Sequence, residues 1–298
     1  MPSRRPPRSA GKGRRPPARG GRSGPPRSGP PRSGPPRQGG GGGGAKRSGG
    51  GSSGTPGLGG DQVEGRQAVR EALLGPRSVR ELLLAADLDP APILDDIREL
   101  AEEQRVPIRE IKRSTLEAQA RSEAPQGVVA TVAPLQPTPL EDLVAVDRPF
   151  LLVLDGLHDP QNLGAVLRTA ETAGVTGVIL PKHRSVRVTA SVTKTAAGAV
   201  EWLPMAVVPG IPTALADLKA KGIWIVGLDQ DADESLWDLK VATEPLALVL
   251  GNEGTGLARL TRERCDVVAA LPLAGRLGSL NVSAAAAVAC YEIARLRR

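Results

Sequence analysis

The sequence predicts an α/β fold built around a buried parallel sheet, and two observations support this prediction. After residue 149, short runs that are apolar throughout recur between turn signals, and stretches with helical spacing separate them. Such apolar strands are typical of parallel sheets covered by helices on both faces. The predicted strands are 150–154, 177–180, 205–208, 223–227, 246–250 and 267–271. The predicted helices are 162–173, 189–199, 213–220, 256–263 and 281–297.

The first 60 residues have a different composition. They contain 13 of the 39 Lys and Arg residues and no Asp or Glu, and they include three RSGPP units and a glycine run at 39–44. This segment cannot bury enough apolar surface to offset chain entropy, so we expect a disordered basic arm. Such an arm can bind a nucleic-acid backbone without sequence specificity, or it can serve only to keep the protein soluble. The rest of the chain is mildly acidic, with 26 basic and 32 acidic residues.

Residues 61–134 predict a small α/β domain. The stretch 61–75 has helical spacing, 79–88 reads as a strand, and 93–106 reads as an amphipathic helix. Short strands are predicted at 108–113 and 127–135. Residues 135–149 are rich in Pro and charge and predict a linker with a short helix, so the larger domain comprises residues 150–298.

Several function classes are excluded by what the sequence lacks. No apolar run approaches the roughly 20 residues of a membrane span, and the N-terminus has no apolar core of a secretory signal. Two cysteines, Cys265 and Cys290, make no disulfide framework, and His158 and His183 suggest no metal site. We therefore expect a cytoplasmic protein without metal. The stretch GNEGTG lacks the P-loop Lys-Ser/Thr and the G-x-G-x-x-G spacing, which argues against an NTPase or an NAD enzyme.

The candidate site lies where the strands end. Ligands of parallel sheets bind outside the carboxyl ends of the strands, which directs attention to the segments after Leu154, Gly227, Leu250 and Leu271. Three of these segments carry clustered Gly, Asn, Glu and Ser: DGLHDPQNLGAVLRTAETAG, GNEGTGLARL and PLAGRLGSLNVSAAAA. Simpler explanations stay open, because Asn and Ser cap helices, a loop Glu is commonly exposed, and Arg168 could pair with Glu171 one turn away.

Together these three segments resemble the motifs of the SpoU/TrmH family of RNA ribose 2′-O-methyltransferases, in the same order over residues 150–298. The stretches EGRQAVREAL and APQGVVATV resemble the L30e-like substrate-binding domain of the branch that acts on large-subunit ribosomal RNA. The resemblance implies a SPOUT-type sheet with a C-terminal trefoil knot. It also implies a homodimer with a shared active site, and S-adenosyl-L-methionine as methyl donor.

The resemblance also assigns roles to residues. The implied catalytic residues are Arg168, Asn162, Glu253, Ser279 and Asn281, with Ser283 in support. The implied cofactor contacts are Gly251, Leu271, Leu280, Gly227 and Leu228, and we expect that Gly251 lets the backbone approach the ligand. A guanidinium stays charged, so we expect Arg168 to orient the 2′-hydroxyl or stabilise an alkoxide rather than to accept a proton.

The leading functional hypothesis is therefore methylation of a ribose 2′-hydroxyl in RNA, on a guanosine of 23S ribosomal RNA. One alternative changes only the substrate, to transfer RNA or to an adenosine site of ribosomal RNA linked to antibiotic resistance. Another alternative is an RNA-binding ribosome-assembly factor. It requires that catalysis be secondary or lost, which the presence of all five implied catalytic residues disfavours.

Overall fold

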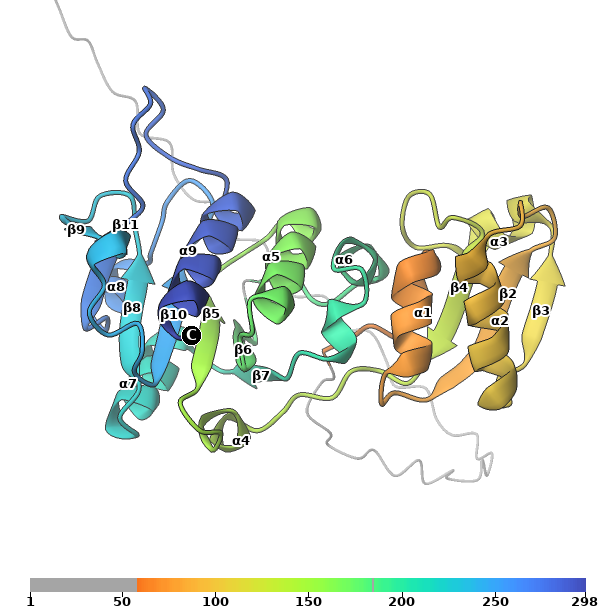
Figure 1. Cartoon of the computed structure of the whole chain (residues 1–298), viewed down its shortest axis with the longest axis horizontal. Coiled ribbons are helices and arrows are strands. Elements are labelled where there is room, and N and C mark those ends of the chain that lie inside the picture. The colour runs from red at the N-terminus through yellow and green to blue at the C-terminus, as the bar shows by residue number, and fades with distance from the viewer. Residues whose placement is uncertain (1–57, 184) are drawn as a thin grey trace, which may run out of the picture. The chain divides into compact units, whose positions relative to one another are not determined.

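The computed structural model describes residues 58–183 and 185–298. The expectations for the basic arm fall almost entirely on residues 1–57, which lie outside the described residues. The described chain contains two sheets (Figure 1): a four-stranded sheet with order β1-β4-β2-β3 and a seven-stranded sheet with order β7-β6-β5-β10-β8-β11-β9.

The four-stranded sheet is mixed. Strand β4 pairs antiparallel with β1 and β2, and β2 pairs parallel with β3. Its elements in chain order are β1 (Gln62–Glu64), α1 (Arg66–Leu74), β2 (Val79–Ala85), α2 (Pro92–Glu103), β3 (Ile108–Ile111), α3 (Arg113–Gln119) and β4 (Val128–Val132). The predicted helix over 61–75 was wrong at its start, because residues 62–64 form a strand and Gly65, at φ 91°, turns the chain into α1.

Two further features of the four-stranded sheet were not predicted. Helix α3 is short and buries one apolar side chain, Leu116. Glu64 is fully buried and accepts hydrogen bonds from Gln62 Nε2, from the backbone N–H groups of Arg121 and Ser122, and from Ser122 Oγ. A buried carboxylate is stable only when donors surround it, so these bonds fix the chain that follows α3 against β1.

The seven-stranded sheet is parallel throughout, which confirms the predicted fold class. All six predicted apolar runs are strands, and the seventh strand is the two-residue β9. The strands are β5 (Phe150–Leu154), β6 (Gly177–Pro181), β7 (Met205–Val208), β8 (Trp224–Leu228), β9 (Glu234–Ser235), β10 (Leu246–Leu250) and β11 (Val267–Ala270). Strand β10 lies between β5 and β8, although it follows both in sequence.

Helices cover both faces of this sheet. One core cluster joins alternate residues of β5 and β10 to α5 (Pro160–Thr172), α6 (Ala190–Thr195) and α9 (Val282–Leu296). The other cluster joins the remaining residues of the same strands to α4 (Leu140–Val144) and α7 (Ile211–Ala220). Figure 1 shows α9 beside α5, and these two helices pack on each other. The central strands are therefore buried on both faces, which explains why they are apolar throughout.

Three shorter helices complete the described chain. They are η1 (Ala199–Glu201), η2 (Leu236–Asp238) and α8 (Arg259–Arg262). Helices α6 and α8 are shorter than the predicted 189–199 and 256–263. Gly198 adopts the left-handed conformation after α6, and the loop after β10 continues to Ala258. Among the described residues, none of the helices is both long and apolar enough to cross a bilayer.

Candidate functional site

A cavity of about 500 Å³ opens at the carboxyl ends of β8, β10 and β11. This is the sheet edge at which the sequence predicts a ligand site. The apolar part of its lining consists of seven side chains, which are Leu228, Leu250, Leu271, Leu273, Leu280, Val282 and Ala285. The ionisable side chains in the lining are all acidic: Asp229, Asp231 and Glu253. The volume lies in the range of small-molecule sites, and the mixed lining suits a ligand with both an apolar and a cationic part.

The loop after β10 forms one wall of the cavity and closes on itself. The backbones of Asn252 and Gly256 exchange two hydrogen bonds of 2.9 and 3.0 Å. A Cβ on Gly251 would lie 2.2 Å from the carbonyl group of Gly256, far inside van der Waals contact. Gly251 lines the cavity as expected, but its lack of a side chain is required by the loop's own backbone. Asn252 Nδ2 donates to the Gly156 carbonyl at 2.8 Å and so ties this loop to the end of β5.

A chain of hydrogen bonds joins all three sequence segments beside the cavity. Asn162 Nδ2 donates to Glu253 Oε1 at 2.8 Å, and Asn281 Nδ2 donates to Asn162 Oδ1 at 3.1 Å. Asn281 Oδ1 in turn accepts from the backbone N–H and the hydroxyl of Ser283, at 2.8 and 2.6 Å. We call these four residues the Asn-Glu network. It uses both polar atoms of each Asn side chain, so each side chain has one orientation.

The two helix-capping alternatives have different outcomes. Asn281 does cap α9, and its amide nitrogen reaches Asn162 at the same time. Asn162 does not cap α5, because Asp159 accepts from the N–H of Gln161 and Pro160 occupies the first turn. Asn162 lies inside the helix, where its side chain is available to the network. The predicted start of this helix at residue 162 was therefore two residues late.

Of the cavity wall that β8 and the following loop contribute, the sequence analysis named Leu228 but not the residues after it. Asp229 follows β8, and its carboxylate pairs with Arg262 Nη1 at 2.5 Å and accepts from the Asp231 N–H at 3.0 Å. The neighbouring Thr261 donates to Asp155 Oδ2 at 2.6 Å. Helix α8 thus fastens the ends of β5 and β8 to each other. The rule that ligands lie at strand ends points to this segment but does not select Asp229, Asp231 or Arg262.

The cavity brings together most of the residues that the resemblance assigned. Its lining includes Leu228, Gly251, Glu253, Leu271, Ser279, Leu280 and Asn281. Asn162 joins them through the network. Gly227 is not in the lining, because its Cα faces Leu257 and Cys265, which a Cβ would meet at 2.7 and 2.8 Å.

Arg168 lies outside the lining, and its side chain is exposed on α5. Within the described part of the chain its guanidinium has no ion-pair partner, so the pairing with Glu171 considered above does not form. The cavity of one chain therefore has an acidic lining without a cation.

Neither cysteine is suited to nucleophilic chemistry. Burial, with a smaller effect of Asp266, raises the pKa of the Cys265 thiol to about 11, and burial raises the pKa of Cys290 to about 12. Within residues 58–183 and 185–298, no group of His, Cys, Asp and Glu side chains is arranged to hold a metal ion.

Two family models match the chain in agreement with this geometry. The SpoU rRNA Methylase family matches residues 149–291, and the RNA 2′-O ribose methyltransferase substrate binding domain matches residues 62–138. The first match contains the cavity and the Asn-Glu network, and the second contains the four-stranded sheet.

Among similar proteins are two named 23S rRNA (guanosine-2′-O-)-methyltransferase RlmB. The one from Pseudomonas aeruginosa is 43% identical over 244 residues, which is 80% of this chain and 97% of the relative. The one from Escherichia coli is 41% identical over 243 residues, which is 80% of this chain and 99% of the relative. A solved structure of the SpoU methyltransferase AviRb from Streptomyces viridochromogenes, in complex with AdoMet, is 28% identical with a TM-score of 0.68 and covers 79% of this chain and 89% of that chain.

Proposed function

Since this chain belongs to the SpoU rRNA methylase family, we propose that it methylates the ribose 2′-hydroxyl of a guanosine in 23S ribosomal RNA. S-adenosylmethionine is the methyl donor of the family. The observation that carries the proposal is the Asn-Glu network, which joins the three family segments at the rim of one cavity. A ribosomal RNA substrate also implies a cytoplasmic enzyme.

The cavity at the ends of β8, β10 and β11 is the donor site in this proposal. The leucines suit the adenosine part of the donor, and Asp229, Asp231 and Glu253 suit its positive charge. The acidic lining would repel a polyphosphate, which is consistent with the exclusion of nucleotide-triphosphate chemistry. When bound, the donor supplies an electrophilic methyl group on a cationic sulfur.

The Asn-Glu network prepares the position of the ribose. Glu253 and Asn281 line the cavity, and Asn162 holds both of them, so the network fixes polar atoms of two loops relative to each other. Glu253 keeps one carboxylate oxygen free of the Asn162 bond to accept from a ribose hydroxyl, and Ser279 offers a second polar group in the lining. Fixed groups of this kind contribute mainly by orienting the reacting hydroxyl.

Arg168 acts, in this proposal, across a homodimer. It lies outside the cavity of its own chain, exposed on α5, which packs beside α9. A second copy that docks on this helical face would bring its Arg168 to the cavity. The cation would then orient the 2′-hydroxyl and stabilise the oxyanion that forms there, while the proton leaves to solvent.

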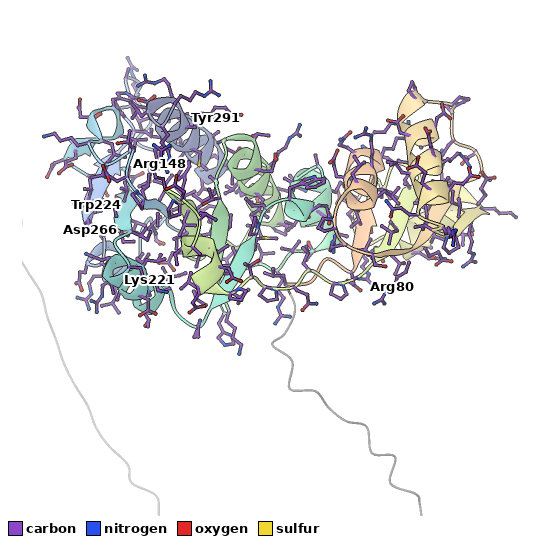
Figure 2. All side chains as sticks on the ribbon, turned by 60° about the horizontal axis from the view of Figure 1, so that its bottom comes forward. Arg80, Arg148, Lys221, Trp224, Asp266 and Tyr291 are labelled. Atoms are coloured by element: carbon purple, nitrogen blue, oxygen red, sulfur yellow. The ribbon has the colours of Figure 1, made fainter. Side chains whose placement is uncertain are left out.

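The surface of α9 supports such a dimer. Ala284, Val288 and Tyr291 follow one another at helical spacing on the exposed side of α9, opposite its buried residues. Tyr291, which is labelled in Figure 2, is 50% exposed. Leu277, in the loop before α9, is 81% exposed. Contiguous exposed apolar side chains are typical of interaction surfaces. Because this stripe lies on the same sheet face as α5, it is the expected dimer contact.

We also propose that the C-terminal segment forms the trefoil knot of the family. The support is that β10 lies between two strands that precede it, and that α9 returns to pack on α5 and reaches Asn162 through Asn281. Mechanical extension from both ends would test it, because a knotted chain stays shorter than its residue count allows. Full extension would contradict the knot.

We also propose a separate function for each segment of the chain. The four-stranded sheet at residues 61–134 would bind RNA, residues 135–149 would link it to the catalytic part, and residues 150–298 would carry out transfer. The family match over residues 62–138 supports the first assignment. The basic arm at residues 1–60 would add contacts to the RNA backbone.

The substrate is tested by mass spectrometry of ribosomal RNA from a strain that lacks the gene. Loss of one ribose methyl on a 23S guanosine, restored by the wild-type chain but not by Arg168→Ala, supports the proposal. Loss of a methyl from transfer RNA or from an adenosine would favour the alternative substrates. Unchanged RNA with defective ribosomes would favour an assembly factor.

The shared active site is tested by mixing two inactive variants, Arg168→Ala and Asn281→Ala. If Arg168 acts on the partner's cavity, an equal mixture regains about a quarter of wild-type activity. Half of its dimers would be mixed, and each would have one intact site. If Arg168 acts within its own chain, the mixture stays inactive.

A further inference from the structure

The three carboxylates in the cavity lining differ in how they are compensated. Asp229 is 10% exposed at its side chain and forms an ion pair with Arg262, so its charge is largely balanced. Arg262 Nη2 also contacts the backbone carbonyl of Asp231, at 3.5 Å. The Asp231 carboxylate itself is exposed in the lining and, within the described part of the chain, has no ion-pair or hydrogen-bond partner. Glu253 accepts a hydrogen bond from the neutral amide of Asn162 and is assigned to the ribose in the proposed function. Asp231 is therefore the unbalanced carboxylate of the lining that the reaction itself does not use.

The charge of the ligand in this cavity changes during the reaction. The donor carries a sulfonium, an ammonium and a carboxylate, for a net charge of +1. Methyl transfer breaks the S–C bond and leaves its electron pair on sulfur, so the product, S-adenosylhomocysteine, has a net charge of zero. The released positive charge leaves as the proton of the 2′-hydroxyl. An unbalanced carboxylate in the lining thus attracts the donor and is indifferent to the product.

We propose that Asp231 is a specificity-determining residue that makes the cavity prefer the cationic donor to the neutral product. The Asp229–Arg262 ion pair is the positioning element that holds the Asp231 backbone in the wall. This inference rests on the assignment of the cavity as the donor site. A single charge acting across roughly 8 Å, at an effective dielectric constant near 60, changes an affinity about threefold. The enzyme would gain faster product release without weaker donor binding.

The test is calorimetric titration of Asp231→Asn with S-adenosylmethionine, S-adenosylhomocysteine and sinefungin, which carries an ammonium near the sulfonium position. We expect affinity for both cationic ligands to fall about threefold, affinity for the product to stay within error, and the difference to shrink at high salt. Asp233→Asn is the matched control, because Asp233 is exposed in the same loop but outside the lining. Asp231→Glu keeps the charge, so the ratio of donor affinity to product affinity should stay at its wild-type value. Equal weakening of all three ligands would overturn the inference, since it would indicate lost shape rather than lost charge.

Two further variants sharpen the result. Arg262→Gln added to Asp231→Asn leaves Asp229 as the unbalanced carboxylate, so the ratio of donor affinity to product affinity should rise above that of Asp231→Asn alone. An unchanged ratio would contradict the role of charge. Ala285→Leu fills the cavity from α9 and should weaken donor and product equally. If Ala285→Leu changes neither affinity, the cavity is not the donor site and the proposed function fails. If it weakens both but Asp231→Asn leaves the ratio unchanged, only the charge inference fails.

Discussion

Replacing Asn162 by Asp tests whether the Asn-Glu network is a coupled unit. The change removes the donor that Asn162 presents to Glu253 at 2.8 Å and puts two carboxylates within hydrogen-bond distance. Glu253 is exposed, so we use a water-like dielectric constant, which gives a repulsion of roughly 1–2 kcal/mol at 3 Å. The lost charge-assisted hydrogen bond adds about 1 kcal/mol at an exposed site. The expected loss of stability is therefore about 2–3 kcal/mol.

The assay is thermal unfolding of a double-mutant cycle. For a protein of this size, Asn162→Asp should lower Tm by roughly 4–12 °C. Glu253→Gln alone should cost little, because its amide oxygen can still accept from Asn162. In the double variant, the amide of residue 253 donates to the new carboxylate of residue 162. The double variant should therefore regain about 2 kcal/mol of the stability that Asn162→Asp alone loses. If the stability changes of the two single variants add up to that of the double variant within about 0.5 kcal/mol, the coupling is refuted.

Three further predictions concern the loop after β10, the cysteines and the basic arm. Gly251→Ala should destabilise the protein by about 3 kcal/mol and weaken donor binding, because its Cβ would lie 2.2 Å from Gly256. Gly275→Ala, where nothing lies within 4 Å, is the control in thermal unfolding, and equal Tm values would contradict the steric reasoning. Because its pKa is raised from 9.0 to about 11, Cys265 should react with iodoacetamide at pH 8 roughly tenfold more slowly than an unperturbed thiol, since the smaller thiolate fraction is partly offset by a more nucleophilic thiolate. Mass spectrometry follows the modification, and a rate like that of glutathione would contradict the burial. Deleting residues 1–57 should weaken RNA binding most at low salt and reduce the slope of log affinity against log salt. An unchanged slope would exclude the arm from RNA binding.

The large sheet could be predicted from the sequence because its strands are buried on both faces. Burial of every side chain makes runs such as Phe150–Leu154 and Leu246–Leu250 apolar without interruption, and turn residues mark their ends. Strand β1 gave no such signal, since it has three residues and two of them, Gln62 and Glu64, are polar. Glu64 is buried only because donors near residue 121 reach it from a distant part of the chain.

The site could be predicted in part, for a similar reason. The carboxyl-end rule and the three segments placed Glu253, Ser279 and Asn281 in one cavity. The roles proposed for Asp231 and Arg262 depend on a contact between segments that are far apart in sequence, which no local pattern encodes. Gly251 was expected to let the backbone approach the ligand, and Gly227 was expected to contact it, but protein atoms occupy the space that a Cβ would take at each position.

The central place of β10 has a consequence for synthesis on the ribosome. The nascent chain makes β5 and β8 well before the strand that separates them in the finished sheet. Until β10 emerges, both strands present open hydrogen-bonding edges made of apolar residues, and such edges readily pair with the wrong chain. Between the emergence of residue 228 and that of residue 250 from the ribosome, β5 and β8 therefore both lack the strand that covers these edges, and we expect mispairing of either edge in that interval.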